Sequence, residues 1–151
     1  MPVSYHSRQP RPDQPYRFCP TLVELARDSD VLVIATPGGA DTRHLVDQPV
    51  LEALGPEGFL VNIARASVVD TNALLQALQQ RQIAGAALDV FDDEPQVPDA
   101  LKVLDNVVLT PHVAGLSPQA SRDTVAMVGQ NLLAHFEGRP LLTPLALPAP
   151  N

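Results

Sequence analysis

The chain has 151 residues, 45% of them hydrophobic, and a formal net charge of −7 at pH 7, which fits a single globular domain with an adequate core. The negative charge disfavours nucleic acid as a partner, because nucleic-acid binding depends on Lys and Arg neutralising phosphates. No stretch approaches the roughly 20 apolar residues of a membrane span, no signal peptide opens the sequence and the single Cys19 cannot form an internal disulfide, so we expect no membrane partner and a cytoplasmic location.

The first third of the chain predicts a short strand, a long loop, a helix and a buried strand. Residues 3–5 begin as a strand, and the Pro- and Arg-rich residues 6–20 are expected to form only a loop. Thr21, with Glu24 three residues later, has the form of a capping box that opens a short helix. The unbroken apolar run of residues 31–35 is typical of a strand covered on both faces.

The rest of the chain alternates helices with strands. Strands are expected at residues 59–64, 84–91 and 107–110, and helices at 49–54, from Asp70 or Thr71, and from Ser117 and Pro118 to Gly138. In the last helix, Val125, Val128, Leu132 and Phe136 recur at helical spacing and predict a buried stripe, although this helix could also serve as an interface. The Pro- and Leu-rich end of the chain predicts irregular structure.

This alternation predicts an α/β fold with a parallel, doubly wound sheet. Sheets of this kind that bind dinucleotides normally begin with a strand, a G-x-G-x-x-G turn and a helix whose N-terminus holds the pyrophosphate. The eight glycines of this sequence are scattered and form no such motif. If the strand order of such folds applies, residues 3–5 correspond to the second strand. We then expect a partial doubly wound (Rossmann-like) sheet without its first strand and glycine-rich loop, over residues 1–140, followed by an irregular tail over residues 141–151.

A missing first strand has a structural consequence. In the strand order 3-2-1-4-5-6, strand 1 lies between strands 2 and 4, so its absence leaves two pieces with unpaired hydrophobic edges. The sequence thus looks like a fragment. We expect the isolated chain to rearrange its sheet, to borrow a partner or to aggregate, and a monodisperse monomer in light scattering would contradict this.

Three short stretches follow predicted strands and carry chemically useful side chains. They are Asn-Ile-Ala-Arg at residues 62–65, Leu-Asp-Val-Phe-Asp-Asp-Glu-Pro at 88–95 and Leu-Thr-Pro-His at 109–112. The carboxyl ends of parallel strands meet at the crevice where open α/β sheets bind ligands. In this order and spacing the stretches resemble the nucleotide-binding half of D-isomer-specific 2-hydroxyacid dehydrogenases. Residues 29–144 are most similar to the glyoxylate/hydroxypyruvate reductase branch.

The resemblance implies hydride transfer from a nicotinamide to a small 2-oxo acid, with a proton added to the carbonyl oxygen to give the D-2-hydroxy acid. His112 matches the family's acid/base, and imidazole suits this task because its pKa lies near neutral pH. Glu94 matches the carboxylate that orients the imidazole. Arg65 matches the group that clamps the substrate carboxylate and polarises its carbonyl. Each residue alone is more often a surface residue or a structural cap.

Cofactor contacts also follow from the resemblance. Ser7 and Arg8 lie where the family contacts the adenosine ribose, and an arginine there accommodates the 2′-phosphate of NADP, so NADP is expected in preference to NAD. The alternative is a solvated arginine in a basic loop. The other residues placed at the cofactor are Thr36, Pro37 and Thr42 at the adenosine side, and Ile63, Ala64, Arg65, Asp89, His112, Ala114 and Gly115 at the nicotinamide. Asp89 could instead be only a buried, hydrogen-bonded carboxylate.

One position departs from the family pattern, which usually has glycine where this chain has Ala66. If that position needs a positive φ, alanine costs about 1 kcal/mol and could displace Arg65. His6, His44, His135 and Cys19 show no metal-ligand spacing, so no metal is expected.

Alternatives to the dehydrogenase remain open. One is a non-catalytic remnant that acts as an interaction or structural module, and the other is a different nucleotide-binding α/β protein, such as one using S-adenosylmethionine. The latter gives no reason for Arg65, Glu94 and His112 to occur together. The resemblance further implies a small 2-oxo or 2-hydroxy acid as substrate and a homo-oligomer, typically a dimer.

Overall fold

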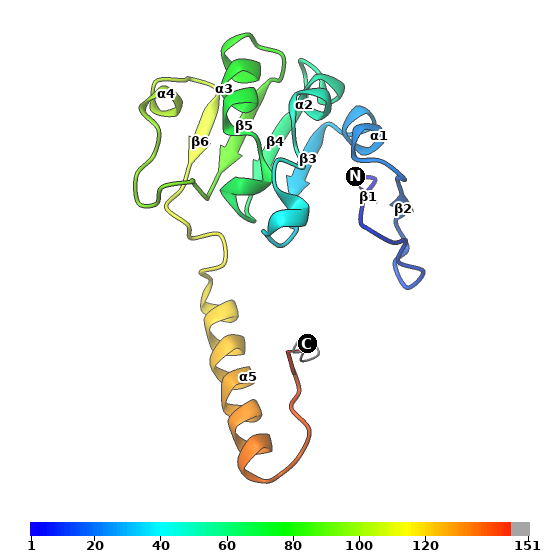
Figure 1. Cartoon of the computed structure of the whole chain (residues 1–151), viewed down its shortest axis with the longest axis vertical. Helices are drawn as coiled ribbons and strands as arrows, with labels where there is room; N and C mark the ends of the chain where they lie inside the picture. The colour runs from blue at the N-terminus through cyan, green and yellow to red at the C-terminus, as the bar shows by residue number, and fades with distance from the viewer. Residues whose placement is uncertain (146–151) are drawn as a thin grey trace. The chain divides into compact units, whose positions relative to one another are not determined.

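The computed structural model of the chain describes residues 1–145 (Figure 1). The chain forms two compact units, Met1–Val113 and a second that begins at Ala114. The expected domain end at residue 140 falls inside the second unit, and the expected tail extends beyond the described residues. Within those residues, no helix is both long and apolar enough to cross a membrane.

The first unit contains two parallel sheets. Its strands are β1 (Ser4–Tyr5), β2 (Arg17–Phe18), β3 (Val31–Ile34), β4 (Phe59–Asn62), β5 (Gly85–Leu88) and β6 (Val107–Leu109). β1 pairs with β2, and the other four form a sheet in the order β3-β4-β5-β6. The parallel α/β fold is confirmed, and the two separate sheets agree with the expected split into two pieces.

The helices of the first unit are α1 (Leu22–Arg27), α2 (Gln48–Leu54), α3 (Thr71–Gln79) and α4 (Asp99–Lys102), with 3₁₀ turns η1 (Ala40–Thr42) and η2 (Ala66–Val68). Three of these helices, α1, α2 and α3, start at capping side chains, whereas α4 follows Pro98 and has no side-chain cap. The capping box of Thr21 and Glu24 is present at α1. The side chains of Asp47 and Asp70 accept amide hydrogen bonds at the N-termini of α2 and α3.

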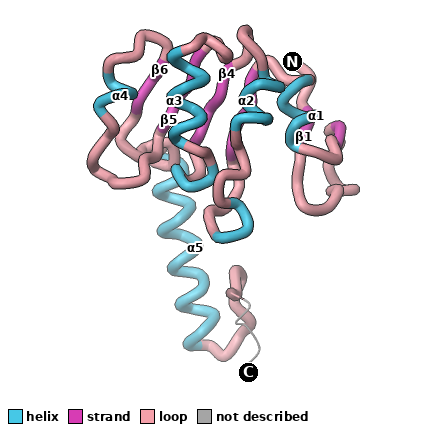
Figure 2. Tube along the Cα trace, turned by 45° about the horizontal axis from the view of Figure 1, so that its top comes forward, coloured by secondary structure: helices cyan, strands magenta, loops and turns pink. Residues whose placement is uncertain are grey.

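The four-stranded sheet is buried on one face only. Leu32, Leu60 and Ala86 lie in register on adjacent strands and are buried against the helices. α2 and α3 lie in front of the strands in Figure 2. Successive right-handed crossovers that advance in one direction place their helices on the same face. The opposite face stays open in this unit, with Val33 54% exposed, so the expectation that residues 31–35 are covered on both faces was wrong.

Part of the expected N-terminal loop is a strand. Tyr5 pairs with Phe18 in parallel, and their rings lie 5.5 Å apart. The Cys19 amide extends this ladder by donating to the Tyr5 carbonyl oxygen at 2.8 Å. The expectation of a loop throughout residues 6–20 was therefore wrong, because a two-residue strand is too short to show an alternating pattern.

The second unit consists of α5 (Pro118–Phe136) and the segment that follows it. The Ser117 hydroxyl accepts a hydrogen bond from the Ala120 amide at 3.0 Å, which caps the helix as expected. The predicted buried stripe was wrong: Val125, Val128, Leu132 and Phe136 are exposed by 73, 54, 54 and 82%. A single helix with one short returning segment has too little surface to cover an apolar stripe.

Candidate active site

The three stretches that follow β4, β5 and β6 leave the sheet side by side. The amides of Ile63, Asp89 and Thr110 donate to carbonyl oxygens of the neighbouring strand ends at 3.4, 3.0 and 3.0 Å. These bonds continue the parallel ladder beyond the last paired residue of each strand. The stretch after β3 leaves the same end of this parallel sheet, so the candidate residues that follow these four strands are gathered there, whereas Ser7 and Arg8 follow β1 in the other sheet.

His112 and Glu94 form the central pair of the site. His112 Nδ1 lies 2.8 Å from Glu94 Oε2, and Glu94 Oε1 accepts a hydrogen bond from the Phe91 amide at 3.0 Å. The hydrogen bond with His112, followed by that of Phe91, lowers the pKa of Glu94 below its ordinary value. Because Glu94 engages Nδ1, Nε2 is the ring nitrogen left for proton exchange with a ligand.

The segment that carries His112 is anchored by Asp89. Asp89 is 3% exposed, and its Oδ1 accepts hydrogen bonds from Thr110 Oγ1 at 2.5 Å and from the Val113 amide at 2.8 Å. The His112 amide donates to the Asp89 carbonyl oxygen at 2.9 Å, and His112 has a φ of 55°. This geometry supports the structural reading of Asp89, and its contact with a nicotinamide stays a prediction.

Arg65 enters the site from the turn between β4 and η2. Its Nη1 donates to the Ala64 carbonyl oxygen at 2.6 Å, and its charge contributes to the lowered pKa of Glu94. The guanidinium of Arg65 and the imidazole of His112 therefore both act on the Glu94 carboxylate. The concern about Ala66 is removed, because the described non-glycine residues with positive φ are His44, Arg81 and His112.

Two residues near Arg65 were given no role by the sequence. The side chain of Asn62 is 2% exposed and bonds to the backbone of the Arg65 turn. Asn is a known signal for a side chain that bonds to the backbone two residues further on, as Asn62 does to the Ala64 amide. A Cβ at Gly38 would lie 2.8 Å from Arg65 Cγ, so the β3 loop and the Arg65 stem are in close approach. No sequence signal marks that contact.

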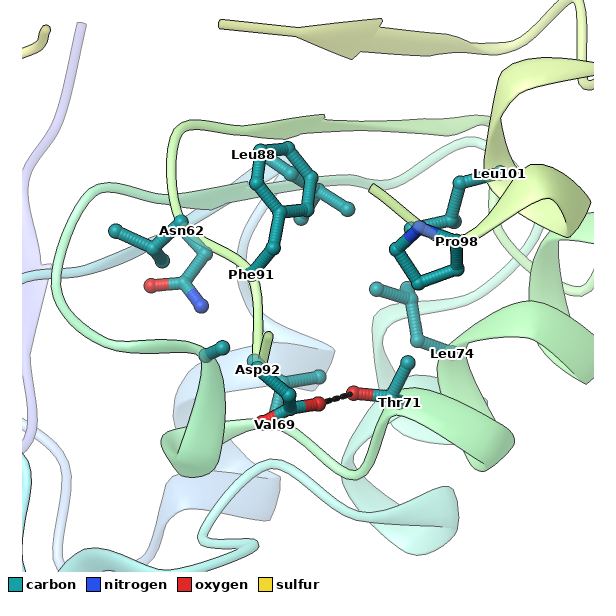
Figure 3. A pocket seen from close by; sticks show the side chains of 11 residues that line it. Asn62, Val69, Thr71, Leu74, Leu88, Phe91, Asp92, Pro98 and Leu101 are labelled. Carbon is teal, nitrogen blue, oxygen red and sulfur yellow. Dashed lines mark hydrogen bonds between the residues drawn. The ribbon is translucent and has the colours of Figure 1, made fainter. Parts of the chain in front are cut away.

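A small cavity lies beneath this part of the sheet (Figure 3). Its volume is about 20 Å³, and its lining includes Asn62, Leu88 and Phe91. Thr71 Oγ1 donates to Asp92 Oδ2 at 2.8 Å across one wall. The space is comparable to one water molecule, so it is no substrate pocket.

The residues expected at the adenosine side are partly engaged within their own loops. Ser7 Oγ donates to the Gln9 carbonyl oxygen at 2.6 Å, and Thr42 Oγ1 donates to the Pro37 carbonyl oxygen at 2.8 Å. Arg8 is exposed just after β1. The position of these groups against a cofactor stays a prediction.

On the nicotinamide side, Ile63 is exposed and Ala64 is buried. The exposed apolar side chain of Ile63, at the carboxyl end of the sheet, suits packing against the flat face of a nicotinamide. The guanidinium of Arg8 suits an ion pair with a phosphate. Thr36 is half-buried after β3. Ala114 and Gly115 begin the second unit, and their place at the site stays a prediction. Among residues 1–145, no group of three or more His, Cys, Asp or Glu side chains could hold a metal ion.

Residues 1–114 match the protein family described as "D-isomer specific 2-hydroxyacid dehydrogenase, NAD binding domain". The chain is 47% identical to glyoxylate/hydroxypyruvate reductase A of Arabidopsis thaliana and 45% identical to hydroxyphenylpyruvate reductase of Plectranthus scutellarioides. Each alignment spans 144 residues, 95% of this chain and 46% of the relative. An NADPH-dependent glyoxylate/hydroxypyruvate reductase from Sinorhizobium meliloti, crystallised with NADP and malonate, superposes with a TM-score of 0.88 at 45% identity, over 97% of this chain and 46% of that one. The chain thus spans about half the length of the relatives it matches.

Proposed function

Because this chain belongs to the D-isomer-specific 2-hydroxyacid dehydrogenases, we propose that it is part of an enzyme that reduces a small 2-oxo acid to the D-2-hydroxy acid. The substrate is of the glyoxylate or hydroxypyruvate type, in line with the names of its relatives. The observation that carries the proposal is the His112–Glu94 pair, in which His112 Nδ1 lies 2.8 Å from Glu94 Oε2. The pair lies at the carboxyl end of the sheet, where Arg65 also lies.

Substrate binding is assigned to Arg65. A guanidinium presents paired donors in a plane, which match the two oxygens of a carboxylate. The same cation draws electron density from the adjacent carbonyl group and favours negative charge on its oxygen. Arg65 therefore orients the 2-oxo acid and prepares the carbonyl carbon for attack.

Proton transfer is assigned to His112. Its Nε2 gives a proton to the carbonyl oxygen while the carbonyl carbon accepts a hydride, and the product is a hydroxyl group on that carbon. The reduced nicotinamide, when bound, supplies the hydride. Glu94 holds the ring through Nδ1 and so directs Nε2 to the proton transfer. In the reverse reaction His112 takes the hydroxyl proton.

The cofactor is proposed to be NADPH rather than NADH. Exposed Arg8 just after β1 can pair with a 2′-phosphate, and the S. meliloti relative was crystallised with NADP. Arg8→Ala should weaken NADPH binding at least tenfold and leave NADH binding unchanged in a fluorescence titration. Arg11→Ala, another exposed arginine of the same loop, is the matched control. Equal losses for both cofactors would contradict the role of Arg8.

The activity is tested by following NADPH consumption with hydroxypyruvate and with glyoxylate. Turnover by the purified chain that His112→Ala abolishes would support the proposed roles. Turnover that survives both His112→Ala and Arg65→Gln would refute them. A folded chain that binds neither NADPH nor a 2-oxo acid would place the activity outside this chain and favour the second candidate.

The second candidate is a non-catalytic module that binds another polypeptide. The exposed apolar stripe of α5, with Val125 and Phe136 at its ends, favours it. The same surface is consistent with a homo-oligomer. A cytoplasmic location is also proposed, and the buried free thiol of Cys19 is compatible with it. Light scattering after gel filtration measures the association. A monomer that co-purifies with no other protein would count against this candidate.

A further inference from the structure

The turn that carries Arg65 is closed by the side chain of Asn62, the last residue of β4. Asn62 Nδ2 donates to the Arg65 carbonyl oxygen at 3.0 Å, and Asn62 Oδ1 accepts from the Ala64 amide at 3.0 Å. The two bonds grip the main chain on both sides of the peptide that joins Ala64 to Arg65. One side chain therefore fixes the backbone from which the guanidinium projects.

The neutral primary amide of Asn62 supplies both the donor and the acceptor that these two bonds need. An aspartate would offer no donor to the Arg65 carbonyl, and a leucine of similar size would offer neither group. Asn62 is 2% exposed, so bulk water does not replace a lost bond easily. The Arg65 carbonyl oxygen also accepts from the Val68 amide at 3.2 Å, which ties the same turn to the last residue of η2.

The stem of Arg65 is confined from another side. A Cβ at Gly38 would lie 2.8 Å from Arg65 Cγ and 3.2 Å from Arg65 Cβ, which is closer than ordinary contact. The β3 loop thus restricts the side chain while Asn62 restricts the main chain. Together they leave Arg65 little freedom to approach the site from a different point.

We propose that Asn62 is a positioning residue that sets the point from which Arg65 reaches the substrate carboxylate. This inference rests on the proposed function of Arg65. It assigns to Asn62 no contact with substrate or cofactor, since the side chain is 2% exposed and bonds to the backbone of the turn. Figure 3 shows the Asn62 side chain on the wall of the small cavity.

The test compares Asn62→Leu with Asn106→Leu in the full chain. Asn106 is the matched control, because its Nδ2 also donates to backbone carbonyl oxygens, of Leu78 at 3.3 Å and Ala84 at 3.4 Å, at the opposite end of the strands. The first readout is the NMR resonance of the Arg65 Nε–Hε group. The second is the affinity for oxalate, a small dicarboxylate probe, in the presence of NADPH.

We expect Asn62→Leu to shift the Arg65 resonance and to weaken oxalate binding about tenfold or more, because small misplacements of a binding group cost large factors. Asn106→Leu should change neither. Asn62→Ser, which keeps an acceptor for the Ala64 amide in a weaker turn, should fall between the native chain and Asn62→Leu. An unshifted resonance in Asn62→Leu, or equal oxalate losses in Asn62→Leu and Asn106→Leu, would overturn the inference.

Failure of the proposed function gives a different pattern. If Arg65→Gln binds oxalate as the native chain does, the role of Arg65 is wrong. If the native chain binds no oxalate, the proposed function of this chain fails. Whether Asn62 fixes the position of Arg65 is then judged by the Arg65 resonance alone. An unchanged resonance in Asn62→Leu overturns that role. If Arg65→Gln loses oxalate binding but Asn62→Leu does not, the function stands and the inference fails.

Discussion

Thr110→Val removes one hydroxyl from the network that holds the His112 segment. Thr110 Oγ1 donates at 2.5 Å to the carboxylate of Asp89, which is 3% exposed. A hydrogen bond to a charged group contributes about 1.5–3 kcal/mol. Thr110 itself is exposed, and the Val113 amide still donates to the same oxygen, so the low end applies. We expect Thr110→Val to lower the free energy of unfolding by about 1.5 kcal/mol.

Urea denaturation followed by circular dichroism measures this change. Thr110→Val should lower the transition midpoint without changing the slope, because the area exposed on unfolding is the same. Thr110→Ser is the control, since it keeps the donor and should retain most of the stability. The reasoning is refuted if Thr110→Val is as stable as the native chain, or if Thr110→Ser loses as much as Thr110→Val.

His112→Ala should raise the pKa of Glu94 towards its ordinary value of 4.5, because the hydrogen bond with His112 is the main cause of the lowered pKa. Carboxyl ¹³C NMR titration measures this pKa. A titration midpoint of Glu94 that does not move would contradict the pairing. Since that pKa is lowered in the folded chain, the stability contributed by Glu94 is complete above the ordinary value and is lost as the pH falls through the lowered one. Native and Glu94→Gln chains should therefore differ in thermal stability at neutral pH and converge in strong acid. Gly38→Ala should displace Arg65 and weaken oxalate binding, because the added Cβ would lie 2.8 Å from Arg65 Cγ. Gly129→Ala, where a Cβ meets only open space, should leave oxalate binding unchanged. Equal effects of the two substitutions would rule out the close contact between Gly38 and Arg65.

The parts of the fold predicted from the sequence are those encoded by neighbouring residues. The side chains of Thr21 and Glu24 each accept a hydrogen bond from the backbone amide of the other, within one helical turn. Their capping box can therefore be predicted without knowledge of the tertiary structure. The strands that lead to Arg65, Glu94 and His112 were predicted from their apolar runs, although β4 and β5 end at Asn62 and Leu88, before the expected ends at residues 64 and 91. Parallel pairing then brings those ends together, as the 2.8 Å contact between His112 and Glu94 shows.

The parts that the sequence did not predict depend on distant segments. The exposure of Val33 depends on which face of the sheet the crossover helices cover. The apolar run of a single strand does not indicate which face that is. The pairing of Phe18 with Tyr5 joins two-residue strands across a Pro-rich loop. The contact between Gly38 and Arg65 joins loops from different strands, so neither local sequence contains it.

The continuation of the parallel ladder into the site has a consequence for its dynamics. Ile63, Asp89 and Thr110 donate their amides to neighbouring strand ends, as residues within a sheet do. Local openings follow the cooperative units to which hydrogen bonds belong. These three amides should therefore exchange with solvent deuterium as slowly as those inside β4 and β5, and more slowly than those of ordinary surface loops. The chemistry-bearing groups would then share the lifetime of the sheet itself, and the geometry of the site would persist between encounters with ligand instead of being rebuilt at each one.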